Sequence, residues 1–148
     1  MIGSRVIAGA ILGLWAGAAL AQAGQYGSAA EARAMLDRVV AAVRANKATA
    51  LASFTRGEAG FKDRDLYPFC AGPDGLFTAH PTLTGRSLAE LKDWTGKAFG
   101  AEIRSVAREG RVAEVTYAWP RPDGFDASDK TAFVTRIGDQ VCAVGYYR

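Results

Sequence analysis

The sequence is poor in the residues that most often build metal and catalytic centres. Its 148 residues contain one histidine, His80, and two cysteines, Cys70 and Cys142. One histidine and two distant cysteines lack the close ligand spacing typical of zinc sites. No glycine-rich phosphate loop and no pair of carboxylates in a shared apolar segment is evident either. We therefore expect no metal site and no cofactor.

The excess of charge of one sign over the other is also small. The chain has 18 Lys and Arg against 15 Asp and Glu, a formal net charge of +3. The basic residues are scattered along the chain and form no cluster. Because a nucleic-acid-binding domain usually carries a basic patch or stripe, we expect no nucleic-acid partner.

A long hydrophobic run occurs only at the N-terminus. Residues 1–23 combine one basic residue, an apolar stretch and a closing Ala-Gln-Ala. This pattern is typical of a secretory signal peptide, with cleavage expected after Ala23. A membrane anchor is the alternative, although the apolar core of residues 6–20 is shorter than the roughly 20 residues of a span. The sequence therefore predicts a periplasmic or secreted protein with one domain, residues 24–148.

Export changes the interpretation of the two cysteines. Cys70 and Cys142 enter an oxidising compartment together, so a disulfide between them is the expected state. Such a bond contributes on the order of 4 kcal/mol in the chain-entropy model. The alternative is a catalytic pair of Cys70 and His80, which needs a free thiolate and a third group to orient the histidine.

The first half of the mature chain predicts a helix and a hairpin. Ser28-Ala-Ala-Glu31 has the form of a capping box, and apolar residues then recur at helical spacing. We expect one long amphipathic helix at residues 28–54 that covers a sheet. Residues 66–71 and 76–80 predict two strands around a turn. Pro68 cannot donate to a strand ladder, so it requires an edge or a bulge there.

The second half predicts short helices followed by three strands. Ser87 can cap a short helix at residues 88–93, and a second helix is expected at residues 97–108. The strands are expected at residues 111–119, 131–137 and 140–147, with Gly138-Asp139 joining the last two. This order predicts an α+β fold with a mostly antiparallel sheet of about five strands.

Short motifs in this order resemble the single Cache domains of the second type. They are LYPF at 66–69, DG at 74–75, AHP at 79–81, GR at 85–86, LKD at 91–93, GK at 96–97, YAWPRP at 117–122, Lys130, FV at 133–134 and VGYY at 144–147. The resemblance covers residues 28–148. It implies an extracytoplasmic sensor with a PAS-like sheet, a long N-terminal helix and a pocket for a small organic molecule, often a short carboxylate.

A carboxylate pocket needs a cation or several donors, and aromatic walls that exclude water. Five residues supply these groups within the resembling motifs: Tyr67, His80, Tyr117, Trp119 and Lys130. Each also has a structural alternative. The aromatic residues can belong to the core, Lys130 can be solvated at the start of a strand, and His80 can bond to the backbone.

Other polar residues of the motifs are expected to be structural. Arg86, Asp93 and Lys97 are interpreted as a loop brace and as charges at helix ends. Arg121 and Asp123 either cover the mouth of the pocket or form an exposed turn.

We interpret the chain as a non-enzymatic sensor for a small organic ligand. Because it ends at Arg148 with no signalling domain, we expect it to pass its ligand state to a partner protein, and the helix at residues 28–54 can support a homodimer. One alternative is an accessory subunit that binds a partner through this helix. The other is a hydrolase built on Cys70 and His80.

Overall fold

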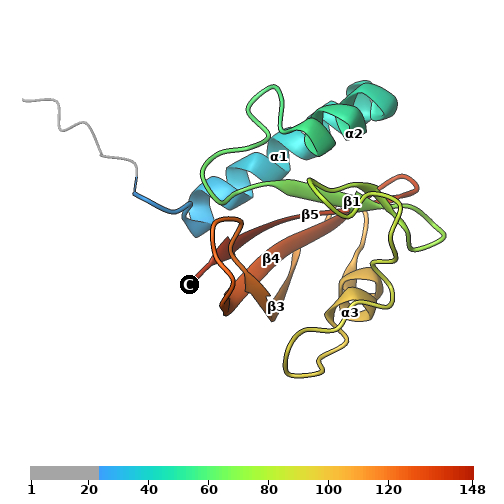
Figure 1. Cartoon of the computed structure of the whole chain (residues 1–148). Coiled ribbons are helices and arrows are strands. Elements are labelled where there is room, and N and C mark those ends of the chain that lie inside the picture. Colours follow the sequence, from blue (N-terminus) through green and yellow to red (C-terminus); the bar gives the residue numbers. More distant parts are fainter. Residues whose placement is uncertain (1–23) are drawn as a thin grey trace, which may run out of the picture.

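The computed structural model describes residues 24–148, so the predicted signal peptide lies outside the described residues. A five-stranded antiparallel sheet forms the centre of the fold. Helices α1 and α2 cover one face of the sheet, and α3 with its flanking loops covers the other (Figure 1). The α+β architecture with a mostly antiparallel sheet is as predicted.

The predicted long helix is divided into α1, Ala29–Ala45, and α2, Lys47–Arg56. The capping box of Ser28 and Glu31 starts α1 as expected. The prediction of one continuous helix is wrong because Asn46 adopts an extended conformation with φ −160° and ψ 98°. Its side chain accepts a hydrogen bond from the Thr49 backbone N–H at 3.0 Å and so caps α2. Asparagine competes well for such backbone bonds, which explains the break.

The strands follow the order β2-β1-β5-β4-β3. Their bounds are β1 Pro68–Ala71, β2 Phe77–Ala79, β3 Ala113–Pro120, β4 Ala127–Ile137 and β5 Gln140–Tyr147. The β4–β5 hairpin turns at Gly138-Asp139 as predicted, with Gly138 at φ 59°. Strand β4 starts four residues earlier than predicted. Lys130 therefore lies inside a strand, paired with Tyr117 on one side and Tyr147 on the other.

Pro68 occupies the first position of β1, which is an inner strand of the sheet. It pairs with Val144 of β5, whereas β2 pairs only with Cys70 and Ala71. The missing N–H of Pro68 therefore leaves no gap in the β1–β2 ladder. An irregularity does occur in β1, but it lies between Cys70 and Ala71.

The predicted short helix at residues 88–93 is absent, and turns take its place. Ser87 Oγ does accept a hydrogen bond from the Glu90 N–H at 3.2 Å. However, the chain leaves the turn toward Asp93, whose carboxylate accepts the N–H groups of Thr95 and Lys97. These bonds hold an irregular loop ahead of α3, Phe99–Val106, which lies within the second predicted helix.

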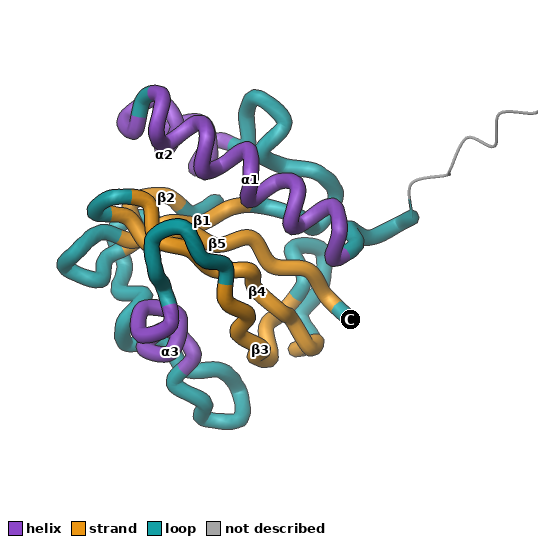
Figure 2. The backbone as a smooth tube through the Cα atoms, turned by 180° about the vertical axis from the view of Figure 1, so that it is seen from behind, coloured by secondary structure: helices purple, strands orange, loops and turns teal. Residues whose placement is uncertain are grey.

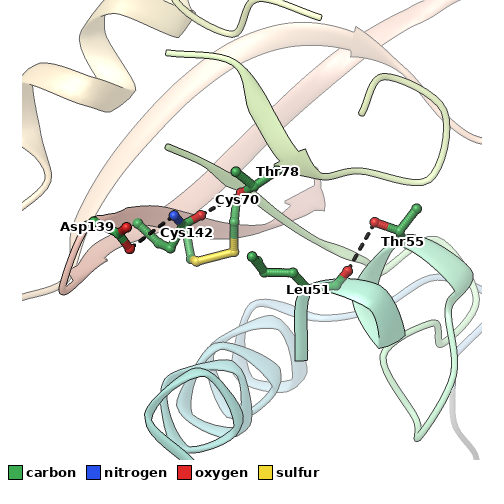
Figure 3. The surroundings of a disulfide bond; sticks show 7 residues. Leu51, Thr55, Cys70, Thr78, Asp139 and Cys142 are labelled. Atoms are coloured by element: carbon green, nitrogen blue, oxygen red, sulfur yellow. Dashed lines mark hydrogen bonds between the residues drawn. A yellow bond between two sulfur atoms is a disulfide. The ribbon is translucent and has the colours of Figure 1, made fainter. Parts of the chain in front are cut away.

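The two faces of the sheet have separate cores. The face under α1 and α2 carries the predicted disulfide between Cys70 and Cys142, which pair directly across β1 and β5. Figure 3 shows Leu51 of α2 pointing toward this bond. Phe69 and Ala71, the neighbours of Cys70 in β1, face the opposite core beside α3. Successive residues of a strand alternate between faces, so the disulfide and the α3 side are separated by the sheet.

Candidate ligand-binding site

Two adjoining cavities lie on the α3 side of the sheet. The inner cavity has a volume of about 10 Å³, and the outer cleft has a volume of about 420 Å³. The inner cavity is lined by Tyr67, Phe69, Phe77, His80, Leu83, Leu88, Leu91, Phe99, Tyr117 and Trp119. The outer cleft is lined by Lys62, Arg64, Tyr67, His80, Pro81, Thr82, Leu83, Trp119, Pro120, Arg121 and Pro122.

Four of the five residues that the sequence predicts for the site line the cavities, and the fifth, Lys130, contacts one of them. Tyr67, His80 and Trp119 line both cavities, and Tyr117 lines the inner one. Tyr67 directly precedes β1, His80 directly follows β2, and Tyr117 and Trp119 share one face of β3. Lys130 of β4 lies behind Tyr67 and belongs to neither lining.

Aromatic rings from β3 and from the first residue of α3 form one wall of the inner cavity. Phe99 stacks on Tyr117 with ring centroids 4.0 Å apart, and it meets Trp119 edge-on at 5.4 Å. Burial raises the pKa of the Tyr117 hydroxyl well above its usual value, so this group stays protonated. The wall is thus apolar, with neutral hydroxyl groups as its polar elements.

His80 is held by the loop that follows it. Its Nδ1 accepts hydrogen bonds from the backbone N–H groups of Thr82 and Leu83 at 3.0 and 3.1 Å. Burial, assisted by the charge of Lys130, lowers the pKa of His80 to about 4, so the ring is neutral at neutral pH. Because Nδ1 is an acceptor, the single ring proton lies on Nε2. His80 can therefore bond to the backbone and still donate to a ligand.

Lys130 is a buried cation with aromatic neighbours. Its side chain is 1% exposed, and Nζ donates to the Tyr67 hydroxyl at 2.9 Å. The Tyr67 and Tyr147 rings lie 4.2 and 4.9 Å from Nζ. Among residues 24–148, no carboxylate lies within ion-pair distance of Lys130. The Tyr67 hydroxyl oxygen is thus the hydrogen-bond acceptor for this cation.

Strand β5 provides the space for this lysine. Gly145 has no side chain, and a Cβ at this position would collide with the Lys130 side-chain carbons. The lysine stem therefore lies across a glycine, which allows the ammonium group to reach Tyr67.

The rim of the outer cleft is cationic. Lys62, Arg64 and Arg121 contribute to its lining, which contains no acidic residue. Two of these cations have acidic partners outside the lining. Arg64 contacts Glu31 at 2.6 Å, and Arg121 contacts the buried Asp65 at 2.9 Å. Lys62 is exposed, and no ion pair joins it to another residue in the described part of the chain.

Sequence reasoning missed most of this rim. Lys62 and Arg64 belong to an irregular segment before β1, where no periodicity or motif marks them. Arg121, which the sequence offers as a residue of the pocket mouth, does line the outer cleft. Asp123 lies outside that lining and is exposed, in agreement with a turn residue.

Asp93 and Lys97 brace the loop to the outer edge of β3. The Asp93 carboxylate accepts the Ala118 N–H at 3.0 Å, and the Lys97 ammonium donates to the Thr116 carbonyl at 2.6 Å. The hydrogen bond from Ala118, helped by Thr95, lowers the pKa of Asp93 to about 2. Both residues thus have structural roles, as expected.

Residues 24–148 contain no cluster of three or more His, Cys, Asp and Glu side chains that could hold a metal ion. None of their helices is both long and apolar enough to cross a membrane.

The fold is that of a PAS-like α+β domain. The family described as Single Cache domain 2 matches residues 14–145, which is most of the chain. This protein therefore belongs to the single Cache domain 2 family.

Solved structures agree with this assignment at the level of the fold. A methyl-accepting chemotaxis protein from Vibrio parahaemolyticus RIMD 2210633 is 23% identical, with a TM-score of 0.65 over 80% of this chain and 86% of that one. The periplasmic sensor domain of a chemotaxis protein is 23% identical, with a TM-score of 0.58 over 78% of this chain and 87% of that one. A Cache chemosensory domain studied for carboxylic acid recognition is 20% identical, with a TM-score of 0.55 over 78% and 85%. The comparison with curated proteins found no match.

Proposed function

We propose that the protein is a non-enzymatic, extracytoplasmic sensor domain that binds a small organic carboxylate. The predicted signal peptide supports export, and membership of the Cache family supports ligand binding. One structural neighbour is a periplasmic sensor domain, and another recognises a carboxylic acid. The Cys–His hydrolase has no support, because Cys70 is bonded to Cys142 on the opposite face of the sheet from the cavities.

The buried Lys130 ammonium group carries this proposal. A buried charge without a counter-ion is costly, and a ligand anion would supply the missing negative charge. Tyr67 lines both cavities and accepts a hydrogen bond from Lys130, so it connects the ammonium group to the place where a ligand anion would bind. His80 Nε2–H is a donor from the wall that the two cavities share.

The cavity rim offers a route by which ligand state reaches a partner. Arg64 Nη1 donates to the carbonyls of Gly24 and Tyr26 at 3.0 Å, and the Arg121 guanidinium lies 4.0 Å from the centre of the Tyr26 ring. Figures 1 and 2 place the start of α1, the β3–β4 loop and the C-terminus at one end of the sheet. A ligand anion that binds Arg64 or Arg121 would weaken the contacts of that arginine with residues 24–27. A partner protein that binds this segment would then respond to the ligand.

Thermal unfolding tests the proposal directly. The purified protein is heated with acetate, propionate, pyruvate, lactate or larger dicarboxylates. A ligand at a hundred times its dissociation constant should stabilise the fold by about 2.7 kcal/mol. In Lys130→Met the ligand shift should disappear, while the ligand-free protein should be as stable or more stable, because an unpaired buried charge is removed.

A matched pair at His80 separates its two roles. His80→Asn retains an acceptor for the Thr82 and Leu83 N–H groups and lacks the Nε2 donor, whereas His80→Gln extends a donor toward the ligand. We expect weaker ligand binding in His80→Asn with a smaller loss of stability than in His80→Gln.

If no carboxylate stabilises the protein, the proposal fails and an accessory subunit that binds its partner through α1 becomes the better hypothesis. Homodimerisation stays a prediction, which light scattering can check.

A further inference from the structure

We infer that the outer cleft accommodates the body of the ligand, and that the ligand is an aromatic carboxylate larger than the short acids implied by the family resemblance. This inference rests on the proposed function and narrows its ligand class. It follows from the size of the two cavities, the nature of the cleft walls and the distribution of charge around them.

The sizes of the cavities are the first step. The inner cavity, at about 10 Å³, has room for about one water molecule. The outer cleft, at about 420 Å³, lies in the range of about 300–1,000 Å³ typical of small-molecule sites. A two- or three-carbon acid would leave most of this cleft filled with water. A ligand with a larger body would bury the cleft walls.

Inside its cationic rim, the cleft has apolar walls that contain three prolines and one tryptophan. Pro81 follows His80 on one side, and Pro120 and Pro122 follow Trp119 on the other. Proline side chains lose little conformational freedom when a ligand covers them, and the indole adds a flat surface. Flat, preformed walls suit a planar ring better than a flexible chain, because less entropy is lost on binding.

Charge sets the orientation of the ligand. Tyr67 and His80 line the cleft, and the Lys130 ammonium group lies directly behind Tyr67, so the carboxylate belongs on this side of the cleft. Lys62 stands at the rim with no ion-pair partner in the described residues, and no acidic side chain lines the cleft. The electrostatic field of the whole cleft therefore favours an anion over a neutral ring compound.

Calorimetric titration of the purified protein tests this inference with benzoate and phenylacetate against acetate and propionate. The aromatic acids should bind at least about tenfold more tightly, because they bury more apolar surface. Benzyl alcohol, which has a ring and no charge, should bind at least about tenfold more weakly than benzoate. Lys62→Glu should weaken benzoate binding severalfold, and Glu90→Gln, a change at an exposed residue that lines neither cavity, should leave it unaltered.

The outcomes separate the two levels of the proposal. If acetate or propionate binds as tightly as benzoate, carboxylate sensing stands and the aromatic ligand class is overturned. If benzyl alcohol binds as tightly as benzoate, the cleft recognises the ring and the carboxylate adds no affinity, so this inference fails as well. If no acid binds, both this inference and the proposed function are overturned.

Discussion

The Arg121 guanidinium donates to the Asp65 carboxylate at 2.9 Å, while the other Asp65 oxygen accepts the Gly27 N–H at 2.7 Å. One buried carboxylate thus joins the β3–β4 loop to the segment that enters α1. Arg121 also lines the outer cleft, so the cleft and the start of α1 share a structural element.

Substitution of Asp65 should loosen this connection. Asp65→Ala leaves the Gly27 N–H and the Arg121 charge without a partner, and we expect a loss of about 2–4 kcal/mol in the free energy of unfolding. Chemical denaturation measures the change. Asp123→Ala, an exposed site in the same loop as Arg121, is the control and should alter stability by less than about 0.5 kcal/mol. Equal stability of the two variants would contradict the role of Asp65.

His80 should make the stability depend on pH. Its pKa is about 4 in the folded protein and 6.5 ordinarily, so below pH 6.5 the unfolded chain binds a proton that the folded chain does not. The stability that the neutral His80 contributes is fully present above about pH 6.5. As the pH falls toward 4, the free energy of unfolding should decrease by on the order of 3 kcal/mol. Denaturation between pH 4.5 and 7 measures it, and His80→Asn should flatten this part of the profile. A slope that persists in the variant would point to other groups.

Gly145 should be indispensable for the position of Lys130. Gly145→Ala places a methyl group against the Lys130 stem, so the ammonium group must leave Tyr67. We expect weaker carboxylate binding and a loss of about 1–3 kcal/mol in stability, as for other overpacked cores. Gly124→Ala is the control, because its new methyl group would meet only the Arg121 Cβ at 4.0 Å. Unchanged ligand affinity in Gly145→Ala would argue against a role for Lys130.

The disulfide should stabilise the fold without taking part in ligand binding. It closes a loop between residues 72 apart in the sequence, and its loss should cost about 4 kcal/mol in the chain-entropy model. Denaturation of the double variant Cys70→Ala and Cys142→Ala measures this cost. Because the bond faces α1 and α2, ligand affinity at a temperature where the variant is folded should be unchanged. A large loss of affinity would show coupling between the faces of the sheet.

Much of the fold could be predicted because local patterns encode it. The capping box at Ser28 starts α1, and the alternation around Gly138-Asp139 places β5 at Gln140–Tyr147, as predicted. The helix break at Asn46 and the loop at residues 88–93 were missed. In both segments, a side chain that bonds to the backbone outweighs the apolar periodicity, and periodicity alone does not reveal this competition.

The position of the five predicted site residues beside the cavities could not be predicted from the sequence, and their role in binding stays a prediction. Tyr67, His80, Tyr117, Trp119 and Lys130 were identified from the chemistry of carboxylates and a family resemblance. Lys130 lies behind Tyr67 because β4 starts at Ala127 and Gly145 faces the lysine from β5. This arrangement depends on the register between two strands, which the segment around Lys130 does not specify.

The sequence by itself determined the elements that short-range physics controls: the α1 cap, the hairpins, the α+β class and a cysteine pair suited to an oxidising compartment. Only the tertiary structure decided which side chains meet. It placed the disulfide and the cavities on opposite faces of one sheet, and it brought Lys62 and Arg64 to the cleft beside Arg121. These contacts join residues far apart in the chain, so their free energy depends on packing and register that no local pattern contains.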